Sequence, residues 1–305
     1  METLKDVFQH LTFPWLFMSI SARRIPYTIR TLISEGRWQT LFCLDGFRDA
    51  LFGNLWAIVG PQVKSNAEVR VIPLLEGRVR NAEVSNQVVS KPVSGRILEV
   101  GAGTGMWADV FLKINTTGQY AGAEAENTDD LTTRRRVAAR GISKIYGVEP
   151  HAQSVKALRQ RTKELGMEDM YEAIPVGIEQ LDDPDATGSA TTIEPGSIDC
   201  IVSILCLCSI PDQEKNIKAL YKLLKPGGRW YVYEHVKVKR GRMLLGWYQR
   251  YTNFFWAFFL GSCRLCNDTA THLKEAGPWS SVDLAQPPDE PVYKVLPHIL
   301  GVLTK

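Results

Sequence analysis

Short apolar segments of strand length alternate with segments of helical spacing in the last two thirds of the chain. The predicted strands span residues 97–100, 142–149, 171–176, 198–205 and 230–233. Residues 198–205 are almost wholly apolar, which is typical of a central strand buried on both faces. The predicted helices between these strands span residues 106–113, 151–165 and 216–224. Two more strands are predicted near the end of the chain, at residues 279–284 and 299–304.

The first 85 residues are rich in aromatic and aliphatic side chains at helical spacing. They predict several short helices, interrupted by Pro14, Pro26 and Pro61 and ending near Gly36, Gly53 and Gly60. Two interpretations stay open. The helices cover one face of the sheet, or they form a cap over a substrate pocket and lie on a membrane surface. The second interpretation would use Trp15, Phe17 and the pair Arg23-Arg24.

A second aromatic-rich segment spans residues 244–260. Such a stripe is usually part of a core. Because Arg242 and Arg250 accompany it, the alternative is a lid over an apolar substrate that dips into a membrane interface. Nowhere do 18 consecutive apolar residues occur, so we predict no membrane-spanning helix.

Between the first strand and the helix after it, the sequence reads Glu99-Val100-Gly101-Ala102-Gly103-Thr104-Gly105. Glycine suits a turn in which backbone N–H groups approach a nucleotide closely and a side chain would collide with it. The spacing G-x-G-x-G differs from the G-x-G-x-x-G of dinucleotide-binding folds. The triphosphate-binding pattern G-x-x-x-x-G-K-[ST] does not occur. The turn therefore indicates a different nucleotide-like cofactor.

Composition bears on three questions: a nucleic-acid partner, the cellular setting and a metal site. The chain has 36 Lys and Arg against 33 Asp and Glu, and a net charge of +3 is too small to indicate a nucleic-acid partner. Six cysteines without a regular framework, and a start without a signal-peptide pattern, favour a reducing cytoplasmic setting. A four-thiolate zinc site could use Cys206, Cys208, Cys263 and Cys266. However, the first two lie in an apolar run, where cysteine behaves as a small hydrophobe. We therefore predict no metal site.

The glycine turn resembles motif I of the class I methyltransferases that use S-adenosyl-L-methionine. Residues Leu224-Lys225-Pro226-Gly227-Gly228 resemble the sharp turn that this family places before its fifth strand. The resemblance covers residues from about 90 to 305. It implies an α/β fold, in which a Rossmann-like sheet of parallel strands carries an antiparallel C-terminal hairpin. The expected domains are an N-terminal helical cap, residues 1–85, and a methyltransferase domain, residues 86–305.

The resemblance also implies cofactor contacts. Glu99 would face the methionine end of the cofactor, in a turn formed by Gly101, Ala102, Gly103 and Gly105. Glu149, at the tip of the second strand, would accept hydrogen bonds from both ribose hydroxyls, because a carboxylate only accepts. Glu124 or Glu126 is the rival for this role, within a polar segment at residues 115–141 that looks like an insertion.

Further contacts are implied downstream. Ile178 would lie against the adenine. Glu179 would accept a hydrogen bond from the adenine amine, or else simply begin the next helix. Cys206 opens the segment in which the cofactor sulfonium and the acceptor meet.

The later segments narrow the resemblance. Leu207-Cys208-Ser209, Glu234-His235-Val236, Cys266-Asn267-Asp268-Thr269 and Pro297-His298-Ile299-Leu300-Gly301 look like those of the alkyl-thiol S-methyltransferase group, which is membrane-associated in animals. They also look like those of fungal polyketide-cluster carboxyl methyltransferases. The implied acceptor is a lipophilic small molecule of secondary metabolism, of the polyketide type, which is methylated at a carboxyl or hydroxyl oxygen. Thiol methylation and a non-catalytic cofactor-binding scaffold are the alternatives.

The resemblance places the acceptor near residues that follow the fourth and fifth strands and on the aromatic segment. The implied substrate pocket is lined by Cys208, Ser209, Glu234, His235, Tyr251 and Phe255. His235 is the candidate general base, since the pKa of histidine suits proton removal. Its alternative role is to orient the acceptor. The oligomeric state is not predicted.

Overall fold

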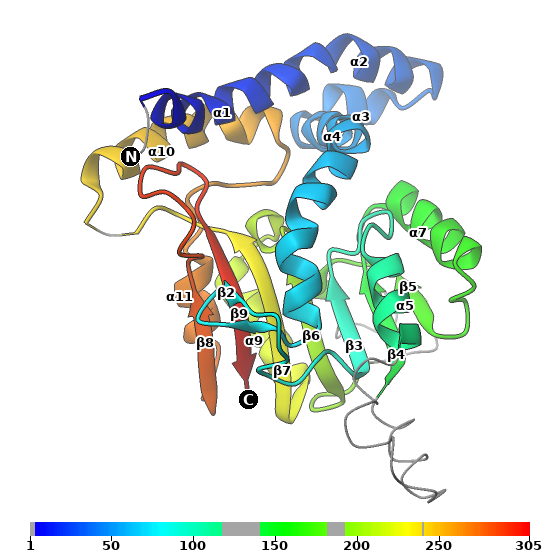
Figure 1. The fold of residues 1–305 in the computed structure, drawn as a ribbon. Coiled ribbons are helices and arrows are strands. Elements are labelled where there is room, and N and C mark those ends of the chain that lie inside the picture. Colours follow the sequence, from blue (N-terminus) through cyan, green and yellow to red (C-terminus); the bar gives the residue numbers. More distant parts are fainter. Residues whose placement is uncertain (1–3, 118–140, 182–192, 240) are drawn as a thin grey trace, which may run out of the picture.

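The computed structural model describes residues 4–117, 141–181, 193–239 and 241–305, and Figure 1 shows their arrangement. Seven of the described strands form one sheet, in the order β5-β4-β3-β6-β7-β9-β8. These strands are β3 (Gly95–Val100), β4 (Ile142–Val148), β5 (Tyr171–Ile174), β6 (Ile198–Ile204), β7 (Leu224–His235), β8 (Ser281–Ala285) and β9 (His298–Thr304). The predicted strands are thereby confirmed, with ends shifted by one or two residues, except that β7 begins six residues early.

Strands β5, β4, β3, β6 and β7 are parallel, and β9 pairs antiparallel with both β7 and β8. The chain leaves β3 toward β4 and β5 and then returns to β6 on the other side of β3. The carboxyl ends of β3 and β6 therefore flank the point where the strand order reverses, which is where open α/β sheets bind ligands. The glycine turn follows β3 directly.

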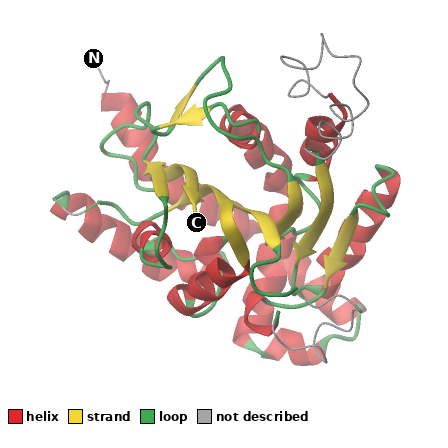
Figure 2. Cartoon of the chain, turned by 90° about the horizontal axis from the view of Figure 1, so that it is seen from below, coloured by secondary structure: helices red, strands yellow, loops and turns green. Residues whose placement is uncertain are grey.

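Helices cover both faces of the sheet, as Figure 2 shows. One face packs against α5 (Ala108–Thr117), α7 (Ala152–Glu164) and the C-terminal part of α4 (Leu44–Leu75), in a core that includes Val71, Phe111 and Leu158. The other face packs against α9 (Gln213–Leu223) and α11 (Thr269–Lys274), through Leu220 and Leu273. Strand β6 is buried on both faces, as the apolar run at residues 198–205 predicted.

The N-terminal region forms helices α1 (Leu4–Arg23), α2 (Ile25–Ser34), α3 (Trp38–Phe42) and α4, followed by a small hairpin of β1 (Val79–Arg80) and β2 (Glu83–Val84). Helix α10 (Met243–Phe259) lies beside α1 at the edge of the molecule away from the sheet (Figure 1). In the described residues, no helix is both long and apolar enough to cross a bilayer.

The predicted helix breaks in this region are only partly right. Pro26 does lie in the first turn of α2, and Gly36, with a φ of +66°, follows the end of that helix. Pro14, however, lies inside α1, and α4 continues through Gly53, Gly60 and Pro61. Gly60 is buried, and a Cβ there would come within 3.1 Å of the Met106 side chain. Close packing, rather than a turn, thus accounts for this glycine.

The turn predicted before the fifth strand is a bulge within β7. Ile198 pairs with Leu224, but Cys200 pairs with Arg229, so β7 has extra residues between the two pairs. Gly227 has a φ of +75°, and a Cβ on Gly228 would lie 2.8 Å from the carbonyl oxygen of Lys225. These glycines are needed where the chain loops out.

Candidate active site

The glycine turn lies against the segment that follows β6. Gly101, Gly103 and Gly105 all have left-handed backbone conformations, with φ values of +66°, +56° and +81°. A Cβ on Gly101 would come within 2.6 Å of the Cβ of Cys206. A Cβ on Gly103, in contrast, would meet nothing nearer than 4.0 Å. The turn is therefore packed on one side and leaves space over Gly103, where backbone N–H groups can approach a ligand.

Glu149 follows β4 and reaches the glycine turn. Its Oε2 accepts a hydrogen bond from the Gly103 N–H at 3.0 Å, and its Oε1 accepts one from the His151 N–H at 3.0 Å. The His151 Nδ1 lies 2.9 Å from the same Oε1. The side chain is buried beside Gly103, and its ribose-binding role stays a prediction. Glu124 and Glu126, the rivals for this role, lie outside the described residues.

Glu99 lies on β3 with only 2% of its surface exposed. Its Oε2 accepts a short hydrogen bond from the hydroxyl of Tyr171, while its Oε1 is buried without a partner among the described residues. Burial raises the pKa of Glu99 to about 7, although the Tyr171 hydrogen bond opposes that shift. Tyr171 is a partner that the sequence analysis missed, since nothing in the sequence marks a strand tyrosine as paired with a carboxyl group.

These features fit S-adenosyl-L-methionine. The space over Gly103 leaves room for a ligand, and the unpartnered Glu99 Oε1 offers a buried acceptor near it. Ile178 is buried at the start of a short 3₁₀ turn after β5, η1 (Ile178–Gln180). Glu179 lies in the same turn and is exposed, and its carboxylate lies over Gly177. The adenine contact of Glu179 stays a prediction.

The backbone changes direction sharply after β6. Leu205 has a φ of +53°, a left-handed conformation that is costly for a residue other than glycine. A hydrogen bond from its N–H to the Tyr233 carbonyl holds this conformation. The next turn, η2 (Leu207–Ser209), carries Cys208 and Ser209. Both the Cys206 and Leu207 N–H groups donate to Oε1 of Glu234, at 3.1 and 3.2 Å.

The predicted pocket role of Glu234 is therefore wrong. Its carboxyl group is fully buried at the end of β7 and faces the backbone after β6 instead of the cavity. Burial raises its pKa to about 7, and the two backbone hydrogen bonds moderate that shift. Glu234 fixes the segment that carries Cys206, Cys208 and Ser209.

A cavity of about 340 Å³ lies between the cap and the carboxyl ends of β6 and β7. Its size is at the lower end of the range for small-molecule sites. Most of its walls are apolar, and many of the lining residues come from α1, α4 and α10. The segment after β6 contributes Leu205, Cys208 and Ser209, and β7 contributes Tyr233 and His235. Three predicted acceptor residues, Cys208, Ser209 and His235, thus share this cavity.

Tyr251 and Phe255 do not line the cavity, so this part of the predicted pocket is wrong. Both aromatic rings pack against Trp15 of α1, with ring centroids 6.0 and 5.4 Å from it. The neighbouring residue Trp256 does line the cavity and stacks on Phe17 of α1, with the ring centroids 5.7 Å apart. The cap side is supplied by one face of α4, at Phe52, Trp56, Val63, Ala67 and Arg70.

Two cysteines and a histidine meet at the wall of this cavity. The Sγ atoms of Cys208 and Cys263 are 3.4 Å apart, and the His235 Nε2 lies 3.3 Å from the Cys263 Sγ. The indole N–H of Trp256, which can only donate, also contacts the Cys263 Sγ at 3.3 Å. Hydrogen bonding to Cys208 and the nearby His235 hold the pKa of the Cys263 thiol well below its usual range. Cys206 and Cys266, which a four-thiolate zinc site would need, are outside this group.

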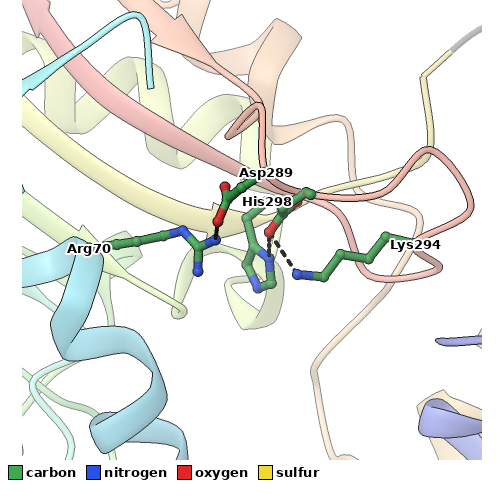
Figure 3. A network of polar contacts seen from close by, with 5 residues as sticks. Arg70, Asp289, Lys294 and His298 are labelled. Atoms are coloured by element: carbon green, nitrogen blue, oxygen red, sulfur yellow. Dashed lines mark hydrogen bonds and ion pairs between the residues drawn. The ribbon is translucent and has the colours of Figure 1, made fainter. Parts of the chain in front are cut away.

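A polar network forms another part of the cavity wall (Figure 3). Arg70 pairs with Asp289 at 2.7 Å, while buried Glu290 accepts from Lys294 at 2.7 Å and contacts the His298 Nδ1 at 2.6 Å. Despite burial, these hydrogen bonds lower the pKa of Glu290 to about 2. This network was not predicted, because Arg70 lies more than 200 residues from Asp289 and nothing in the sequence marks the two as partners.

The sheet order and the glycine turn with its two carboxylates together define a class I S-adenosyl-L-methionine-dependent methyltransferase. A family model described as a methyltransferase domain matches residues 77–259, more than half of the chain. The chain belongs to this family. It is an enzyme of that class, and the alternative of a non-catalytic scaffold is not supported.

Curated relatives match a shorter segment. Thiol S-methyltransferase TMT1B of Rattus norvegicus is 34% identical over 110 residues, which cover 36% of this chain and 44% of the relative. The same enzyme of Homo sapiens is 32% identical over 111 residues, covering 36% and 45%. The matched segment thus spans less than half the length of these relatives.

Among solved structures, a geranyl diphosphate methyltransferase in complex with SAM is similar over 85% of this chain and 90% of that chain, at 13% identity and a TM-score of 0.47. A putative O-methyltransferase from Nostoc punctiforme is similar over 84% and 60%, at 10% identity and a TM-score of 0.49. These likenesses say nothing about the acceptor.

Proposed function

We propose that the enzyme methylates a carboxyl or hydroxyl oxygen of a lipophilic small molecule in secondary metabolism. We also propose that it acts in the cytoplasm. The observation that supports the first of these proposals is the cavity, whose apolar walls adjoin Cys208, Ser209 and His235. A polar edge with Arg70, Lys294 and His298 would suit an acceptor that carries an oxygen function at one end.

The cofactor supplies a methyl group that its sulfonium already activates. What the chain contributes is alignment of the acceptor in a cavity poor in water. A carboxylate acceptor is already anionic near neutral pH and needs no base. For a hydroxyl acceptor, we assign proton removal to His235, a contribution of about 10²–10⁴-fold in the rate.

Thiol methylation is the second candidate. The curated relatives named above are thiol S-methyltransferases, and the cavity wall carries a cysteine and histidine cluster that could accommodate a soft sulfur acceptor. One experiment separates oxygen methylation from thiol methylation. Panels of lipophilic acids, phenols and thiols are incubated with the enzyme and a cofactor whose methyl group is deuterated, and products are identified by mass.

A matched pair of variants on α4 tests whether the cavity holds the acceptor. Val63 lines the cavity, whereas Val69 on the same helix is 65% exposed. Val63→Trp fills the cavity and should raise KM for the acceptor at least tenfold without weakening S-adenosylhomocysteine binding. Val69→Trp should change neither. Equal kinetics for the two variants would place the acceptor elsewhere.

We also propose peripheral contact with a membrane surface, through which a lipophilic acceptor would reach the cavity. The support is a set of large apolar side chains that are exposed on the adjoining helices α1 and α10, namely Leu4, Phe8, Leu16, Met243, Leu244, Trp247 and Phe254. This set is called the α1–α10 apolar face below. Arginines at the ends of these helices, Arg23 and Arg242, would favour anionic lipid.

A further inference from the structure

Cys208, His235 and Cys263 bring two thiols and an imidazole close together at the wall of the cavity. The donor atoms of these residues all lie within 4.8 Å of one another, and all three side chains are buried. Two thiols and an imidazole are the ligand types that Zn²⁺ prefers in proteins. Ordinary packing does not require them to meet, since they come from three separate segments of the chain.

Each ligand is held by its own backbone contacts. The Cys208 carbonyl accepts hydrogen bonds from the Arg264 N–H at 3.1 Å and from the Asn267 side chain at 3.0 Å, which ties the two cysteine segments together. His235 ends β7 and is paired there with His298 of β9. The site is therefore built on fixed elements and would cost little to order when a cation binds.

The spacing of the two sulfur atoms suits a tetrahedral cation after a small expansion. With Zn–S bonds of about 2.3 Å, two sulfur ligands of tetrahedral zinc lie roughly 3.7 Å apart. Cys208 and Cys263 are now 3.4 Å apart, so an outward shift of a few tenths of an ångström is enough. The Trp256 N–H already points at the Cys263 sulfur and would remain as a donor to a metal-bound thiolate.

We propose that Cys208, His235 and Cys263 form a binding site for a thiophilic divalent cation of the Zn²⁺ type, with one coordination position open to the cavity. All three residues line that cavity, so the fourth position faces the space in which we place the acceptor. Three protein ligands with an open fourth position are typical of catalytic zinc sites rather than structural ones. The inference departs from the sequence-based expectation of no metal, which considered only a four-cysteine site.

A consequence concerns the acceptor, and it rests on the proposed function. A thiol or hydroxyl that occupies the fourth position would release its proton to solvent more easily as it binds, because the cation stabilises the anion that forms. His235 would then be a ligand, and the cation would replace it as the group that activates the acceptor.

Cobalt is the probe for the first test. The full chain, reduced and stripped with a chelator, is titrated with Co²⁺, which should bind at one equivalent and give the thiolate charge-transfer and visible bands of tetrahedral cobalt. Zn²⁺ should displace it. The bands should disappear in Cys208→Ser and Cys263→Ser and persist in Cys266→Ser, which removes a nearby cysteine outside the cluster. No thiolate band in the natural sequence, or equal bands in all three variants, overturns the site.

A second measurement does not depend on the folding of variants. X-ray absorption by the natural chain loaded with one equivalent of Zn²⁺ should show sulfur ligands at about 2.3 Å and nitrogen at about 2.0 Å. A shell of oxygen and nitrogen alone overturns the proposal. Methyl transfer is then compared between chelated and loaded enzyme. Equal turnover contradicts the activation step but not the site, whereas cobalt binding without turnover of any acceptor contradicts the proposed function.

Discussion

At position 101, both the left-handed backbone and the close contact with Cys206 require glycine. A side chain there is strained by the φ of +66° and would also overlap the Cβ of Cys206 at 2.6 Å. Sequence reasoning could predict the need for glycine at this turn, because the strand before it and the helix after it are recognisable. It could not predict that Cys206 is the neighbour, since that contact joins segments 105 residues apart.

The first prediction uses a matched pair of glycines. Gly101→Ala should abolish measurable S-adenosylhomocysteine binding by calorimetry, because the turn must move away from Cys206. Gly246→Ala is the control, since Gly246 lies in α10 with no atom within 4 Å of its missing Cβ. It should bind the cofactor product normally. Unchanged binding by Gly101→Ala would contradict the assigned cofactor turn.

The second prediction concerns Glu149. Glu149→Ala should weaken S-adenosylhomocysteine binding by roughly ten- to a hundredfold, because charge-assisted hydrogen bonds are each worth about 1.5–3 kcal/mol. The loss also frees the Gly103 N–H, which Glu149 now holds. Exposed Glu168 provides the control variant, Glu168→Ala. Full affinity in Glu149→Ala would return the ribose role to Glu124 or Glu126.

At the scale of elements, helix α10 shows what a sequence leaves open. The segment was predicted as part of a core or as a lid over an apolar substrate, and it forms a helix. Its rotation was predicted wrongly, because aromatic side chains occur on both of its faces. Tyr251 and Phe255 pack toward α1, whereas Trp256 faces the cavity. Periodicity finds an amphipathic helix but cannot orient one that is apolar nearly all round.

The strands were easier to predict for a physical reason. The burial of β6 on both faces produces a continuous apolar run, and the glycine turn marks where β3 ends. The long helix α4 was harder, since Pro61 and Gly60 are local signals for a break, yet the helix continues through both. Packing of its two halves outweighs the local preference.

The third prediction concerns the link between β7 and the turn after β6. The Glu234 carboxyl group has a pKa of about 7 in the fold against an ordinary 4.5, so the folded state binds its proton more tightly than the unfolded state does. The free energy of unfolding should therefore fall as the pH rises from 4.5 to 7, by about 3 kcal/mol from this group. Glu99 acts in the same direction.

Glu234→Gln keeps an oxygen acceptor for the Cys206 and Leu207 N–H groups but carries no charge. Urea denaturation at pH 5 and pH 7.5 should show a clearly smaller loss of stability for this variant than for the natural sequence. An identical loss in both proteins would mean that the buried carboxyl group is not the source of the pH dependence.

At the scale of the whole molecule, helices α1 and α10, which carry the α1–α10 apolar face, lie on the side of the fold away from the sheet (Figure 1). The fourth prediction is that the double variant Trp247→Glu/Phe254→Glu loses most of its sedimentation with vesicles of phosphatidylcholine and phosphatidylserine at low salt. Both side chains are more than 60% exposed, at 66% and 77%, so the melting temperature should hardly change.

The control is Val84→Glu/Val282→Glu, which adds the same charge to exposed valines on β2 and β8. It should sediment with vesicles like the natural sequence. If neither the natural chain nor this control sediments with vesicles, the proposal of membrane contact is wrong.

Helix α4 runs without a break from the cap to the sheet, and this has a consequence for anyone who exchanges caps between relatives to alter acceptor choice. Each residue added to or removed from the middle of the helix turns everything beyond it by about 100°. Val63 and Arg70 would then turn away from the cavity, and Val71 would lose its place in the core against the sheet. Chimeras should therefore join within α4 only at equivalent helical turns, with whole multiples of about seven residues as the permitted change in length.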